Sequence, residues 1–218
     1  MKVDLLYGKS VLTVSCPAKV EVTVVRKPLM PALDNPGIAV SNALARPIGC
    51  DSLQHLTAGI RSACILICDV TRPVPNRLFL RPLIETLIGA GISSDSITVL
   101  VATGLHRPNE GDELASVIGD DWVLNNIRVV NHNALDDEEH TDLGFTSRTT
   151  PVGLDRRFIE ADLGIATGLV EPHFMAGYSG GRKVVVPGIA QADTIRTLHS
   201  ARFMEDPATV QCNLTGNP

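Results

Sequence analysis

The sequence is poor in aromatic residues and in positive charge. Phe, Trp and Tyr make up only 4% of the 218 residues, which argues against modules that read nucleic acid by stacking bases on aromatic side chains. The formal net charge of −5 also argues against a nucleic-acid surface, because such surfaces carry clustered Lys and Arg. We therefore expect no nucleic-acid partner.

Long apolar runs and paired cysteine motifs are missing as well. The start, MKVDLLYGKSVLTVSC, has no apolar core behind a basic end, so we expect no secretory signal there. No apolar run approaches the length that spans a bilayer, and no membrane association is expected. The cysteines form no CxxC pair, and their odd number prevents complete pairing: Cys16, Cys50, Cys64, Cys68 and Cys212. A reducing cytoplasm is the expected location.

Common metal and nucleotide motifs are also missing. There is no HExxH and no Cys/His pair at short separation, so a metal held here would have few protein ligands. The stretch Gly177–Lys183 (GYSGGRK) lacks the Gly-Lys-Ser/Thr of a P-loop, which excludes an NTPase. Its glycines could still present amides to a phosphate, or form a tight turn without a ligand. The charge run Asp136–Asp142 is interpreted as a solvated loop rather than a metal site.

The first third of the chain predicts a hairpin and a linker. Apolar and polar residues alternate over 3–7 and 10–15 around Gly8-Lys9, which predicts a β-hairpin, and Lys19–Val25 predicts a third strand. A proline-rich linker follows, and then a short helix over Asn35–Leu44.

The remainder alternates strands with helices. Strands are predicted over 63–68, 97–102, 127–130 and 163–167, and helices over 76–88, 112–118, 155–160 and 193–198. The aliphatic core and this alternation predict a mostly parallel sheet covered by helices. We expect one α/β domain over residues 1–218, Rossmann-like with three layers and an N-terminal hairpin extension. Cys64 and Cys68 should share one face of a buried strand as small hydrophobes.

Polar groups follow each predicted strand where it ends. The strands run into Asp69-Val-Thr-Arg72, Thr103-Gly-Leu-His106, Asn131-His132 and Gly168 through His173. Ligands of open α/β sheets bind beyond the carboxyl ends of the strands, so this edge is the predicted site. Each residue also has an ordinary interpretation: a structural histidine for His106 or His173, a helix C-terminal histidine for His199, and a surface Asp–Arg pair for Asp69 and Arg72.

These motifs together resemble the nickel-dependent lactate racemase family. The resemblance rests on Asp69-x-Thr-Arg72, on Ala102 to Pro108 (ATGLHRP), on Asn131-His132 and above all on Glu171 to His199. It runs in order from about residue 10 to the end and covers what looks like the family's N-terminal domain. It implies racemisation or epimerisation of a small 2-hydroxy acid by hydride transfer to a nickel-pincer nucleotide (nickel pyridinium-3,5-bisthiocarboxylic acid mononucleotide), which dedicated biosynthetic enzymes make.

The resemblance also implies roles for single residues. His106 and His173 would be the paired acid and base, and Arg72 would bind the substrate carboxylate. Lys183 would be tethered to the nucleotide through a thioamide, and His199 would supply the protein ligand to nickel. The residues expected to help hold the nucleotide are Asp69, Thr103, Ser179, Gly180 and Gly181.

Two alternatives remain open, a hydroxy-acid redox enzyme of the same superfamily and a cofactor-binding module without turnover. Two candidate acid/base histidines favour the racemase, because a binding module does not need them. The family carries a second α/β domain, and the turn-like end QCNLTGNP favours such a domain beyond residue 218. By itself this chain is expected not to turn over.

Overall fold

The computed structural model describes residues 1–8 and 10–218, and the chain divides into two compact units, Met1–Asp34 and Asn35–Pro218. The first unit contains a β-hairpin, in which β1 (Lys2–Tyr7) runs antiparallel to β2 (Ser10–Ser15). The predicted hairpin is confirmed, although Lys9 of its turn lies outside the described residues.

The third strand predicted over Lys19–Val25 is wrong. Residues 21–25 have no regular structure, and most side chains of the stretch are exposed. An alternating pattern produces a strand only where an edge can be paired and one face buried. In the described part of this unit, β1 and β2 pair only with each other.

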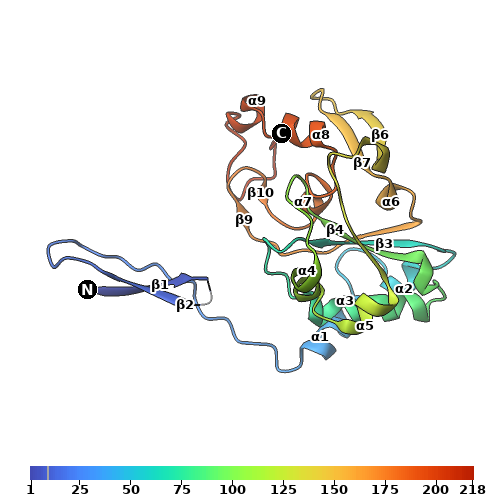
Figure 1. The fold of residues 1–218 in the computed structure, drawn as a ribbon, viewed down its shortest axis with the longest axis horizontal. Helices are drawn as coiled ribbons and strands as arrows, with labels where there is room; N and C mark the ends of the chain where they lie inside the picture. Colours follow the sequence, from blue (N-terminus) through green and yellow to red (C-terminus); the bar gives the residue numbers. More distant parts are fainter. Residues whose placement is uncertain (9) are drawn as a thin grey trace. The chain divides into compact units, whose positions relative to one another are not determined.

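The second unit is built on a four-stranded parallel sheet in the order β5-β4-β3-β8. Each of the four predicted strands is present to within one residue: β3 (Ala63–Cys68), β4 (Ile97–Ala102), β5 (Arg128–Asn131) and β8 (Leu163–Ala166). The chain leaves β3 toward β4 and β5 on one side and returns later to β8 on the other (Figure 1). Such a reversal of strand order opens a crevice at the carboxyl ends of the central strands.

The two faces of the sheet bury alternate residues of β3, because successive strand side chains point to opposite faces. Ile65 and Ile67 pack toward α3 (Asn76–Gly89), whereas Cys64, Cys68 and Leu66 pack with Val184 of α7 (Arg182–Val185). In Figure 1, α3 and α5 (Asp121–Asn126) lie on one side of the sheet and α7 on the other. The predicted α/β fold is confirmed, as is the shared face of Cys64 and Cys68.

The second face is covered partly by an antiparallel hairpin that the sequence did not predict. Strands β6 (His140–Phe145) and β7 (Pro151–Asp155) form it. The solvated loop predicted over Asp136–Asp142 is therefore wrong in part, because β6 begins at His140, whose side chain is buried. The charge run gave a wrong prediction for His140 because the burial of a residue depends on the elements packed against it, not on the acidic residues beside it in the sequence.

The remaining elements are short. The predicted helices appear as α1 (Pro36–Ala45), α4 (Gly111–Ile118), α6 (Arg156–Ile159) and α8 (Ala192–Leu198). Unpredicted elements are α2 (Leu53–Leu56), η1 (Ser94–Ser96), η2 (Asp137–Glu139), β9 (Pro172–His173), β10 (Gly177–Tyr178) and α9 (Ala201–Met204). Among the described residues, none of the helices has both the length and the apolar character needed to cross a membrane.

Candidate functional site

A cavity of about 410 Å³ lies where residues after β3 and β4 meet the segments 169–175 and 179–199. This volume falls in the range of small-molecule sites. Nine of the predicted site residues line it: Asp69, Arg72, Thr103, His106, His173, Ser179, Gly180, Lys183 and His199. Gly181 is not among the lining residues; it precedes α7 with a positive φ of 47°. Asn131 and His132 line a separate cavity of about 210 Å³, which His106 also borders.

The imidazole of His106 is held by Asp69. His106 Nδ1 lies 2.7 Å from Asp69 Oδ2, and Thr71 Oγ1 donates to the other carboxylate oxygen at 2.6 Å. Because a carboxylate only accepts, Nδ1 carries the proton and Nε2 keeps its lone pair. Asp69 is buried, while the His106 side chain is 62% exposed. The pair therefore presents a base to the cavity, and the Asp69 carboxylate is engaged by His106 and not by Arg72.

Arg72 and Lys183 supply positive charge to the cavity. Among the described residues, no side chain pairs with the guanidinium of Arg72 or the amine of Lys183. Burial, and then the charge of Arg72, lower the pKa of Lys183. A lower pKa raises the fraction of neutral, nucleophilic amine. Lys183 is also the only lysine in the sequence after Lys27.

His173 is held differently from His106. Its Nδ1 accepts hydrogen bonds from the backbone N–H groups of Met175 (3.3 Å) and Ala176 (3.2 Å). Burial, and then the charges of Lys183, Arg72 and His199, lower its pKa. The neutral ring therefore carries its proton on Nε2 and acts as a donor in this arrangement. Before Nε2 can accept a proton, the ring must carry its own proton on Nδ1 instead. Nδ1 would then have to release the N–H groups of Met175 and Ala176.

His199 presents one ring nitrogen outward. Its Nδ1 lies 2.7 Å from the carbonyl oxygen of Ile195, one turn earlier in α8. Metal-ligating histidines characteristically donate their second ring N–H to a carbonyl or carboxylate, so Nε2 is the nitrogen available as a ligand. Among the described residues no three His, Cys, Asp or Glu side chains gather to hold a metal ion, so a metal at His199 would need further donors from a bound group.

Ser179 and Thr103 are committed to backbone contacts. Ser179 Oγ donates to the Leu169 carbonyl (2.6 Å) and accepts from the Glu171 N–H (3.0 Å), while Thr103 Oγ1 donates to the His132 carbonyl (2.7 Å). These hydroxyls shape the wall of the cavity. Their N–H groups are engaged as well, Ser179 with the Glu171 carbonyl (2.8 Å) and Thr103 with the Val101 carbonyl (3.0 Å).

Some lining residues were not singled out from the sequence. Arg196 lies one turn before His199 in α8, and Phe174 stacks on the ring of His173 with centroids 4.9 Å apart. The i, i+3 spacing from His199 was the available signal for Arg196. The only signal for Phe174 in the sequence was its position next to His173.

Gly188 is expected to tolerate no side chain. A Cβ there would overlap the carbonyl oxygen of Val184, and the Gly188 carbonyl accepts from Gly104 N–H (2.9 Å) at the cavity wall. Gly188→Ala should lower the free energy of unfolding by about 1–3 kcal/mol, measured by urea denaturation. Gly89→Ala is the control, because it meets nothing within 4 Å and should be neutral or stabilising. Equal midpoints for the two variants would contradict the expectation.

Comparison with known proteins identifies the family. The model of the lactate racemase N-terminal domain matches residues 7–211. The chain belongs to this family. It is 38% identical over 179 residues to a lactate racemase of Lactiplantibacillus plantarum and 37% identical to one of Thermoanaerobacterium thermosaccharolyticum. Each match covers 82% of this chain and 42% of the relative, so the matched region spans less than half the length of those relatives.

Solved structures show the same fold. The lactate racemase apoprotein of Thermoanaerobacterium thermosaccharolyticum superposes with a TM-score of 0.85 and 32% identity, over 100% of this chain and 51% of that one. A protein from Thermotoga maritima superposes with a TM-score of 0.61 at 22% identity, over 82% of this chain and 43% of that one, which shows a shared fold. The predicted membership of the lactate racemase family is confirmed.

Proposed function

We propose that the gene product containing this chain interconverts the enantiomers or epimers of a small, lactate-like 2-hydroxy acid. The single observation that carries the proposal is that His106, His173 and Arg72 line one cavity with Lys183 and His199. A guanidinium binds a carboxylate at two points, and a histidine exchanges protons near neutrality. Two histidines provide the base and the acid that inversion in both directions requires.

The chain's residues fit a tethered nickel-pincer nucleotide. Lys183 offers an amine with a lowered pKa for attachment, and His199 offers one ring nitrogen while the other is held by Ile195. Gly180 lines the cavity with a positive φ of 70°, and a Cβ there would press against the Leu169 carbonyl, so this turn at the cavity wall requires glycine. The nucleotide would supply nickel's remaining donors, which the described side chains do not.

In this mechanism Arg72 binds the carboxylate and orients the hydroxyl toward a histidine. His106 Nε2 takes the hydroxyl proton, and Asp69 stabilises the resulting imidazolium through Nδ1. When bound, the nucleotide would supply a hydride acceptor for the C2 hydrogen, so that no carbanion need form. His173 donates or accepts the hydroxyl proton for the opposite enantiomer, which requires Nδ1 to release Met175 and Ala176.

Two further properties belong to the proposal. All five cysteines are free thiols, which supports a reducing cytoplasm. The His106 side chain is 62% exposed, and the relatives are more than twice as long as the matched region. We assign the closing of the cavity over His106 to a second domain, so that these 218 residues alone should not turn over.

The proposal is tested on the complete gene product, expressed with cofactor-biosynthesis enzymes. We expect bound nickel, an added mass on the protein, and loss of optical activity from one or more pure 2-hydroxy acids, with lactate first in the panel. The 218-residue chain alone should show no turnover. Net oxidation of the acid would indicate a redox enzyme, and loaded protein that changes no acid would indicate a binding module; either result overturns the proposal.

A further inference from the structure

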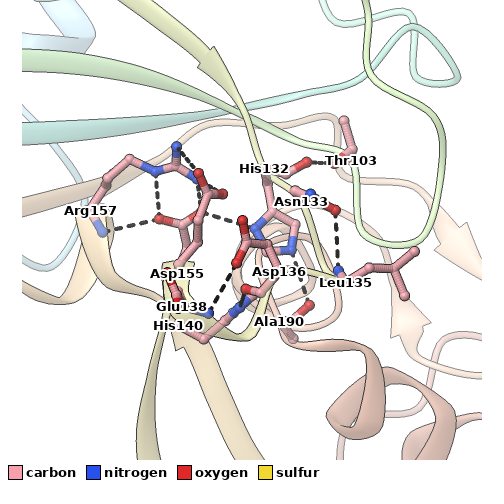
Figure 2. Close-up of polar contacts among 11 residues, drawn as sticks. Thr103, His132, Asn133, Leu135, Asp136, Glu138, His140, Asp155, Arg157 and Ala190 are labelled. Atoms are coloured by element: carbon pink, nitrogen blue, oxygen red, sulfur yellow. Dashed lines mark hydrogen bonds and ion pairs between the residues drawn. The ribbon is translucent and has the colours of Figure 1, made fainter.

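A fully buried histidine lies outside the main cavity, between β5 and β7. His132 directly follows β5, and its Nδ1 lies 3.0 Å from Asp155 Oδ2 at the end of β7. On the other side its Nε2 lies 3.1 Å from the carbonyl oxygen of Ala190. The side chains of His132 and Asp155 are both 0% exposed. Figure 2 shows the ring between these two acceptors.

Both partners of the ring can only accept a hydrogen bond. A carbonyl oxygen has no proton to give, and Asp155 is held as a carboxylate: burial alone would raise its pKa, but hydrogen bonds from Arg157 and His132 outweigh burial and lower the pKa to about 2. Satisfying both contacts therefore requires a proton on each ring nitrogen. In a neutral ring one nitrogen would carry no proton. That nitrogen would then face the oxygen of Asp155 or of Ala190 with no hydrogen between two buried acceptors.

The charges that contact Asp155 also favour a charged ring. Arg157 donates to Asp155 from Nε (2.8 Å) and to Glu139 from Nη2 (2.7 Å), so two carboxylates face one guanidinium. An imidazolium at His132 brings the cluster to neutrality. The ring of His140 on β6 is perpendicular to the ring of His132, with centroids 5.1 Å apart. The thiol of Cys64 on β3 also lies within the electrostatic influence of Asp155 and Arg157.

The His140 ring is compatible with a charged neighbour. Its Nδ1 donates to the Asp136 carbonyl (2.7 Å), and its buried Nε2 has no partner among the described residues. A proton on Nε2 would be an unsatisfied buried donor, so His140 is the neutral ring of the two. One charged and one neutral imidazole avoid repulsion between like charges.

His132 connects to the main cavity through backbone contacts. Its carbonyl accepts from Thr103 Oγ1 (2.7 Å), and its N–H donates to Val101 O of β4 (3.0 Å). Ala190 follows the turn that carries Gly188, whose carbonyl accepts from Gly104 N–H (2.9 Å). Thr103, Gly104 and Gly188 all line the cavity. One residue thus ties the elements that meet at the cavity wall: its backbone holds Thr103 and Val101, and its ring holds Asp155 and Ala190.

We propose that His132 is a buried imidazolium and a positioning residue, which fixes Thr103 and the Gly188 turn against each other and so sets the shape of the cavity wall. The inference rests on the proposed function for its kinetic consequence only. Its structural part, the doubly protonated ring, depends on no ligand.

The test uses the complete gene product with ring-¹⁵N-labelled histidine at pH 7.5. We expect one buried histidine with both nitrogens protonated, assigned by its loss in His132→Gln, a variant that keeps an amide donor. In parallel, His132→Phe should lower kcat per cofactor-loaded molecule by up to about 100-fold, the size of effect expected when a catalytic wall is displaced by about 1 Å. The control is His140→Phe, which replaces a buried ring that packs against His132 but makes no hydrogen bond to the Thr103 or Gly188 segments; it should leave this kcat near wild type.

The outcomes separate the two proposals. If the wild-type protein changes no 2-hydroxy acid, the proposed function fails. The His132 proposal is still decided by the NMR result and by the rate at which Lys183 reacts with an acylating reagent in the apoprotein, expressed without the cofactor-biosynthesis enzymes. That rate should change in His132→Phe, or in His132→Gln if the Phe variant does not fold, and not in His140→Phe. A His132 ring with one unprotonated nitrogen, or variants of His132 that match the control, would overturn it.

Discussion

Replacing Lys183 by Ala in the complete gene product is expected to abolish both the added mass of a bound cofactor and racemisation. The amine is the only candidate of its kind in Asn35–Pro218, where no other lysine occurs. Burial and the charge of Arg72 lower its pKa, so at neutral pH more of it is a free nucleophile than for an ordinary lysine. Intact mass spectrometry and a racemisation assay measure the two effects.

Two variants separate attachment from charge. Lys183→Arg keeps the positive charge in the cavity but cannot form the same acyl-type linkage, so it should lose the added mass as completely as Lys183→Ala. Lys27→Ala removes a lysine from the other unit and should keep both mass and activity. An added mass that persists in Lys183→Ala would show that the attachment lies elsewhere.

Replacing Asp69 by Asn is expected to lower kcat by about 10²- to 10⁴-fold with a small change in KM. An amide can offer a donor to His106 Nδ1, which would place the ring proton on Nε2 and remove the base from the cavity. Among the described residues the hydrogen bonds of this carboxylate go to Thr71 and His106 and not to Arg72 or Lys183, so binding of substrate and cofactor should largely persist. Steady-state kinetics and nickel content per protein check both parts.

The control for Asp69→Asn is Asp162→Asn. The carboxylate of Asp162 accepts hydrogen bonds from the N–H groups of Arg61 and Ser62, near the start of β3. This is the opposite end of that strand from Asp69. Its loss should affect stability and not kcat per folded molecule. If Asp69→Asn retained wild-type kcat, the assignment of His106 as a base oriented by Asp69 would fail.

Local pattern was sufficient for most of the second unit. The strands β3 and β4 are aliphatic runs bounded by polar residues, and burial on both faces of a parallel sheet favours that composition in any context. The pattern failed for Lys19–Val25 and for His140 in β6, because a strand also needs a partner edge, and burial needs a neighbour. Neither is encoded within the segment itself.

The sequence by itself determined which chemistry-bearing residues follow the strands, and through its motifs it determined the family. Only the tertiary structure decided their partners. Asp69 engages His106, which lies 37 positions away, and His132 meets Asp155 and Ala190 at separations of 23 and 58. Hydrogen bonds over such distances depend on how separate elements pack. Periodicity within one segment carries no information about that packing, and so the partners of Asp69 and His132 had to be read from the fold.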